Sequence, residues 1–205
     1  MQNEKRILCY GDSNTWGADS ESDQRFDRHT RWTGVLQDAL GAGFVIIEEG
    51  LGGRTTVRDD PYEPFRNGRT YLAPCVMSHA PLDAVILALG TNDLKNRFNV
   101  GAQDISRGVQ LLIEDIRNYA GQDIEIILVA PAALGNTVDP DDMFGNGVAA
   151  SKQLAKYYKK RADALGVRFF DASSVVELNH GDGIHLNAEN HKAQGEALAQ
   201  ICAKL

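Results

Sequence analysis

Residues 5–15, KRILCYGDSNT, join an apolar strand to a polar turn. Apolar side chains fill positions 7–10, and Gly11 then allows the backbone to turn sharply. Ser13 follows two residues later, at the carboxyl end of what we expect to be the first strand of an α/β sheet. Such sheets bind ligands at this edge. Ser13 is therefore either a nucleophile or an ordinary turn or N-cap residue, and the rest of the chain must distinguish the two.

Apolar strand-like runs alternate with helix-period runs along the whole chain. This alternation, with continuous Ile, Val and Leu in the strands, is typical of a parallel sheet covered by helices on both faces. We therefore predict one α/β domain, residues 1–205, built as a doubly wound three-layer α/β/α sandwich with five parallel strands. The predicted strands are Ile7–Tyr10, Val45–Glu48, Ala84–Leu89, Ile124–Val129 and Val167–Phe170. The predicted helices are Trp32–Leu40, Tyr71–His79, Asp104–Tyr119, Val148–Leu165 and Ala188–Lys204, with Asn187 as N-cap of the last.

Composition excludes several classes of protein. The chain has 205 residues, which suits one domain with a real core, and a formal net charge of −7, which argues against a nucleic-acid partner. It contains no apolar run near the roughly 20 residues that span a bilayer, so we expect no membrane partner. No secretory leader pattern precedes the first strand. We expect a cytoplasmic protein.

The cysteine pattern also indicates a cytoplasmic protein. Cys9, Cys75 and Cys202 are odd in number and far apart, with no C-x-x-C pair. This pattern is typical of a reducing compartment, where thiols act as small hydrophobes. Without a cluster of His or Cys in the sequence, we expect no metal site and no cofactor, and we interpret the Asp-rich stretches as turns. His29, His79, His180 and His191 are expected to be surface or packing residues.

Three connections are longer than compact domains usually have. They are Ala18–Arg31, Arg54–Thr70 and Pro131–Gly147. Loops of this length tend to be functional or mobile. Since two of them follow strand ends, we expect them to line the same rim as Ser13.

Two further turns follow predicted strands. Residues 50–56, GLGGRTT, form a glycine-rich turn whose backbone N–H groups could approach a ligand, although a plain tight turn fits as well. The spacing does not match a dinucleotide or phosphate loop. Asn92, in GTND at 90–93, offers either an Asx turn or a neutral amide that can donate to an oxyanion.

The fourth site, DGIH at 182–185, directly precedes the last predicted helix. A carboxylate three residues before a histidine can lie beside the imidazole, where it would set the tautomer and stabilise the protonated ring. A surface Asp–His pair is the alternative. Taken together, however, the four sites supply a hydroxyl, a base, an orienting acid and oxyanion donors at one edge of the sheet. That combination indicates acyl transfer.

In order and over the whole chain, these sites resemble the blocks of the SGNH (GDSL) hydrolase family. The family's Ser, Gly, Asn and His correspond to Ser13, Gly53, Asn92 and His185, with Asp182 as the acid. Further stretches are similar to the bacterial arylesterase and acyltransferase branch: KRILCYGDS (5–13), TWG (15–17), RWTGVL (31–36), EEGL (48–51), RTT (54–56), GTND (90–93) and DGIH (182–185). One departure is Asn14, which stands where the family has Leu.

The resemblance implies a flavodoxin-like fold and a serine esterase. Ser13, Asp182 and His185 would be catalytic, and the oxyanion hole would comprise the N–H groups of Ser13 and Gly53 and the amide of Asn92. We expect Asn14, Trp16 and Ile184 to contact the substrate.

The implied substrates are short-chain acyl esters, especially acetyl esters, of aryl or other alcohols. They would react through an acyl-enzyme, with transfer to alcohols as a further reaction. The resemblance also implies a homo-oligomer. Alternatives are a carbohydrate acetylesterase, a lysophospholipase or thioesterase, and an inactive flavodoxin-like binding module. The absence of G-x-S-x-G separates the chain from the α/β-hydrolases.

Overall fold

Within residues 4–205, which the computed structural model describes, five parallel strands form one sheet in the order β2-β1-β3-β4-β5. This confirms the predicted fold class. The strands are β1 (Lys5–Gly11), β2 (Phe44–Gly50), β3 (Ala84–Ala88), β4 (Glu125–Ala130) and β5 (Arg168–Asp171).

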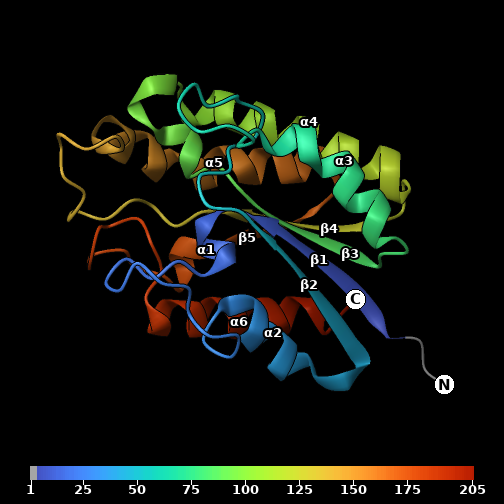
Figure 1. Cartoon of the computed structure of the whole chain (residues 1–205). Helices are drawn as coiled ribbons and strands as arrows, with labels where there is room; N and C mark the ends of the chain where they lie inside the picture. Colours follow the sequence, from blue (N-terminus) through green and yellow to red (C-terminus); the bar gives the residue numbers. More distant parts are fainter. Residues whose placement is uncertain (1–3) are drawn as a thin grey trace.

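Helices cover both faces of the sheet, so the molecule has three layers (Figure 1). One face carries α2 (Trp32–Leu40) and α6 (Ala188–Cys202), and the other carries α3 (Gly68–His79), α4 (Ala102–Ala120) and α5 (Val148–Leu165). A short helix, α1 (Ser13–Trp16), begins directly after β1. Among the described helices, none combines the length and the apolar character needed to cross a membrane.

The strand sequences explain why two helical layers are needed. In β1, Leu8 and Tyr10 belong to the core beneath α3, α4 and α5, whereas Ile7 and Cys9 belong to the core beneath α2 and α6. All four side chains are fully buried. Successive side chains of a strand point to opposite faces, so an uninterrupted apolar strand must be covered on both sides.

Every predicted strand and helix is present, and two helices, Trp32–Leu40 and Val148–Leu165, have the predicted bounds. Asn187 caps α6 as expected, because its side chain accepts the N–H of Asn190 at 2.9 Å. The helix predicted from Tyr71 begins at Gly68 instead. Asn67 accepts the N–H of Arg69 at 3.1 Å and so starts the helix before its apolar residues do. Helix α1 has too few residues to show a periodic pattern.

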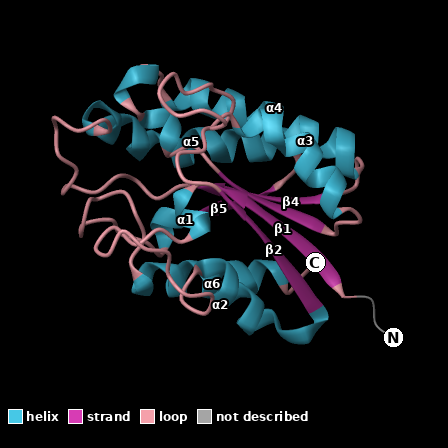
Figure 2. Cartoon of the chain, in the orientation of Figure 1, coloured by secondary structure: helices cyan, strands magenta, loops and turns pink. Residues whose placement is uncertain are grey.

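The strand order places the candidate residues. In a 2-1-3-4-5 sheet, β1 and β3 are neighbours at the point where the winding direction reverses, and ligands bind outside the carboxyl ends there. Gly11, the last residue of β1, pairs with both Gly50 and Ala88. The turns that follow β1, β2 and β3 therefore begin side by side. The ribbon view in Figure 2 shows long loops gathered at this end of the sheet.

Candidate active site

Ser13, His185 and Asp182 form a continuous hydrogen-bonded chain at this edge. Nε2 of His185 lies 3.0 Å from Oγ of Ser13, and Nδ1 lies 2.6 Å from Oδ2 of Asp182. Ser13 opens α1, while Asp182 and His185 lie in the loop before α6. Residues that are 172 positions apart in sequence are thus in direct contact.

The loop fixes the direction of the Asp182 carboxylate. Its Oδ1 accepts the backbone N–H groups of Ile184 at 2.9 Å and of His185 at 3.0 Å, which leaves Oδ2 for the imidazole. Partial burial opposes ionisation of Asp182, but these bonds and the charge of His185 outweigh it and lower its pKa to about 2. Asp182 is therefore an anion at neutral pH.

His185 responds to the same contact. Burial of its imidazole disfavours the protonated ring, but the hydrogen bond and charge of Asp182 outweigh that cost, and the nearby Asp12 adds to their effect. The net result is a pKa above the usual value for histidine.

Asn14 joins α1 to the loop that carries His185. Its Nδ2 donates to the carbonyl of Ile184 at 3.2 Å, and its Oδ1 accepts the N–H of Leu186 at 2.9 Å. The two contacts lie on either side of His185 in the chain. Leucine, the usual family residue here, could make neither bond.

Two positions of the glycine-rich stretch at 50–56 require glycine: Gly50, where a Cβ would lie 2.1 Å from the backbone N of Trp16, and Gly53. Gly53 has φ +77°, a left-handed conformation that other residues adopt only with strain, whereas a Cβ at Gly52 would meet nothing within 4 Å. The turn closes with a hydrogen bond from the Arg54 N–H to the carbonyl of Leu51 at 3.1 Å.

Asn92 follows β3 and contacts this same turn. Its Nδ2 donates to the carbonyl of Arg54 at 3.2 Å, and the side chain is almost fully buried. An amide NH₂ carries two protons, so one remains for another acceptor.

Two residues that the sequence analysis did not select hold these turns in place. Arg54 is buried, and its Nη1 donates to the carbonyls of Gly11 at 2.8 Å and of Glu49 at 2.5 Å. Asp93 is also buried and accepts both the N–H and the Oγ1–H of Thr56, at 2.8 and 2.6 Å. Burial raises the pKa of Asp93 to about 6 despite these bonds. Arg54 lies in the RTT motif (54–56) and Asp93 in the GTND motif (90–93). Their place in these motifs is the only sequence signal for the two residues.

Ile184 and Trp16, which we expected to contact the substrate, both pack against other parts of the protein. Ile184 is 6% exposed and belongs to the core on the α3, α4 and α5 side. Trp16 is half-buried, with the guanidinium of Arg25 5.3 Å from its ring centre. A cavity of about 30 Å³, room for roughly one water molecule, lies beside the turn that carries Ser13. Asp12, Asn14, Thr91 and Leu186 contribute to its lining.

Comparison with known proteins shows the family of the chain. The model of the GDSL-like Lipase/Acylhydrolase family matches residues 9–193, and the chain belongs to that family. No curated protein matches the chain.

Solved structures are similar over nearly the full length. The inhibitor-bound form of an aryl esterase from M. smegmatis has a TM-score of 0.93 and 39% identity, covering 98% of this chain and 99% of that chain. Est24, a carbohydrate acetylesterase from Sinorhizobium meliloti, has a TM-score of 0.91 and 40% identity with the same coverage. A member of the lipolytic protein G-D-S-L family from Veillonella parvula DSM 2008 has a TM-score of 0.73 and 15% identity, covering 98% of this chain and all of that chain. This last likeness concerns the fold.

The Asp182 contact generates a test that needs no substrate. Asp182→Asn removes the charge that raises the pKa of His185, while burial, which lowers it, remains. We expect the pKa of His185, followed by NMR titration of its ring protons, to fall in the variant. Asp38→Asn, beside the exposed His29, is the matched control and should leave His185 unchanged. An unchanged pKa in Asp182→Asn would contradict the assigned cause.

Proposed function

We propose that the protein is a serine esterase that hydrolyses short-chain acyl esters through an acyl-enzyme. The observation that carries the proposal is the chain of contacts from Ser13 through His185 to Asp182. Membership of the lipase/acylhydrolase family supports ester hydrolysis as the reaction class.

The contacts support specific roles. His185 accepts the Ser13 proton through Nε2 as Oγ attacks the ester carbonyl. The carboxylate of Asp182 accepts a hydrogen bond from Nδ1–H, so it holds the ring in the required tautomer and stabilises the imidazolium that forms. His185 then protonates the leaving alcohol, and water releases the acyl group by the reverse sequence. No cofactor takes part in these steps.

The oxyanion would be bound by the backbone N–H groups of Ser13 and Gly53 and by the second amide proton of Asn92. Ser13 opens α1, where backbone N–H groups have no acceptor within the helix. The hydrogen bond from the Asn92 amide to the carbonyl of Arg54, the residue after Gly53, supports a shared role for the other two donors. Such fixed donors stabilise charge without reorganisation during the reaction.

Two structural relatives, an aryl esterase and a carbohydrate acetylesterase, provide two candidate substrate classes. Both are about equally similar to this chain. We propose acetyl and other short acyl esters of aryl alcohols as substrates, with acetylated sugars as the second candidate. Transfer of the acyl group to an alcohol is a further step of the same proposal.

A homo-oligomer remains part of the proposal. Tyr62 and Phe65, in the loop before α3, are 76% and 88% exposed. Large apolar side chains exposed close together are typical of protein contacts. Sedimentation of the purified protein would measure the state of association.

The first test concerns the nucleophile and the acyl group together. With p-nitrophenyl acetate, wild-type enzyme should give a burst of p-nitrophenol followed by turnover, and activity should fall as the acyl chain lengthens. Ser13→Ala should lose both burst and turnover, whereas Ser22→Ala, at an exposed position, should retain them. A burst retained in Ser13→Ala would disprove the nucleophile, and faster turnover of acetylated sugars would favour the second candidate substrate.

The second test concerns the oxyanion. Asn92→Ala removes one of three donors and should lower kcat by about 10²–10³-fold, roughly 3–4 kcal/mol in the barrier. Asn118→Ala, in an exposed position of α4, is the control. Full kcat in a folded Asn92→Ala enzyme would exclude the assignment.

The third test separates two roles for Asn14. Because its amide is bonded on both sides of His185, we expect Asn14→Leu to lower kcat by roughly 10- to 100-fold through misplacement of the base, with KM little changed. A contact with substrate, the expectation from sequence, would instead raise KM and spare kcat. Steady-state kinetics with p-nitrophenyl acetate distinguishes these outcomes.

A further inference from the structure

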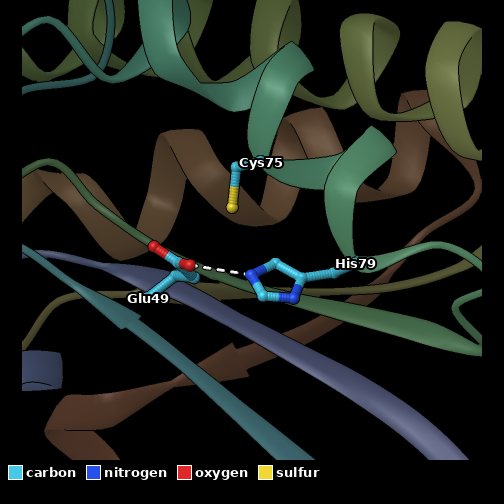
Figure 3. A group of neighbouring side chains, drawn as sticks. All are labelled: Glu49, Cys75 and His79. Atoms are coloured by element: carbon cyan, nitrogen blue, oxygen red, sulfur yellow. Dashed lines mark hydrogen bonds and ion pairs between the residues drawn. The ribbon is translucent and has the colours of Figure 1, made fainter.

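Three side chains of the types that ligate metals lie close together outside the candidate active site. Glu49 lies at the end of β2, and Cys75 and His79 lie in the second half of α3. Their ligand atoms are all within 4.8 Å of one another, and Nε2 of His79 is 2.8 Å from Oε1 of Glu49. Figure 3 shows the three side chains pointing toward one another. From sequence alone no metal site is expected, because the sequence shows no cluster of His or Cys and Glu49 is distant from Cys75 and His79.

The secondary structure explains why these three side chains lie close together. Cys75 and His79 are four residues apart and therefore share one face of α3. In β2, Glu48 points to the α2 face, where it bonds Arg31, so its neighbour Glu49 points to the opposite face, beneath α3.

We propose that Glu49, Cys75 and His79 bind a divalent transition-metal ion, with Zn²⁺ as the best match and a fourth coordination position open to water or another ligand. A thiolate, an imidazole and a carboxylate are all regular zinc ligands. Bond lengths of about 2.0–2.3 Å in a tetrahedron separate ligand atoms by roughly 3.3–3.7 Å. The observed cluster is within reach of that geometry after small side-chain movements.

The charges around the cluster favour a cation. With the thiol deprotonated, Cys75 and Glu49 together carry two negative charges, which offset those of the ion. Both α3 residues lie near the carboxyl end of the helix, where the backbone dipole stabilises positive charge. Arg54, which is also nearby, opposes the ion but stabilises the thiolate.

Binding must release a proton. Burial of the Cys75 thiol, reinforced by the Glu49 carboxylate, raises its pKa to about 12, so the free thiol is protonated at neutral pH. Metal binding would displace that proton, and affinity should therefore rise with pH.

The cluster is accessible from one side. Cys75 is fully buried, but the side chains of His79 and Glu49 remain 30% and 20% exposed. Glu49 also lines a cavity of about 600 Å³ together with Leu51, Arg54, Phe65 and Tyr71. An ion and its fourth ligand can therefore enter without unfolding of α3.

The test uses Co²⁺ as a spectroscopic substitute for Zn²⁺ in purified, chelator-treated protein. We expect one equivalent of Co²⁺ to give a thiolate-to-cobalt charge-transfer band that Zn²⁺ abolishes by displacement. Cys75→Ser should eliminate the band. His79→Gln and Glu49→Gln should each weaken Co²⁺ binding by at least about tenfold.

Two matched controls should retain wild-type binding. His29→Gln disrupts an exposed imidazole–carboxylate pair of the same 2.8 Å length that has no thiol beside it. Cys202→Ser alters another buried thiol, in α6.

Absence of a stoichiometric band in the wild-type protein would overturn the proposal, as would a band that survives Cys75→Ser. If Cys75→Ser fails to fold, the decision rests on His79→Gln and Glu49→Gln, which keep the thiol. Wild-type affinity in both would then overturn it. None of these outcomes depends on esterase activity.

Discussion

The candidate site depends on one buried, positively charged side chain, that of Arg54. The guanidinium of Arg54 donates to the last carbonyl of β1, at Gly11, and to the carbonyl of Glu49 in β2, while its face lies 4.2 Å from the ring centre of Tyr10. The backbone carbonyl of Arg54 in turn accepts the amide of Asn92, which follows β3. A buried charge is tolerated only when it is well paired, and here carbonyl dipoles and an aromatic face supply the pairing. Arg54 thus links the three turns, already adjacent through strand pairing, that would hold the nucleophile and the oxyanion donors.

His185, the proposed base, comes from the other end of the chain and is held by separate contacts. The loop before α6 is joined to α1 by the two hydrogen bonds of Asn14 as well as by the contact between Ser13 and His185. Asp182 bonds only within its own loop, so it orients His185 without contacting α1. The site therefore consists of turns joined by Arg54 and Asp93 and of a loop that Asn14 and the contact between Ser13 and His185 join to α1.

The sequence predicts the strand and helix succession well because short apolar runs mark the strands, most clearly in β3, and helical spacing of apolar residues marks α4. The same reasoning singles out Ser13 and Asn92, because both directly follow predicted strands and parallel strands bring their ends together. Asp182 and His185 stand before the last helix instead, and their spacing of three residues is the sequence signal for them. Contacts between distant positions are not visible in this way. Nothing local to Arg54 indicates that its guanidinium bonds to Gly11, and nothing local to Asn14 indicates its partners at 184 and 186. The grouping of Glu49 with Cys75 and His79 likewise requires the packing of α3 over β2.

Covalent capture of the acyl group tests the central claim most directly. Enzyme quenched in acid during turnover of an acetyl ester can be digested and mapped by mass spectrometry. The account predicts one acetyl group, on the peptide that carries Ser13, and more of it when His185 is replaced by a residue that slows release but still allows acylation by an activated ester. An unmodified Ser13 peptide, or an acetyl group on another residue while turnover proceeds, would contradict it.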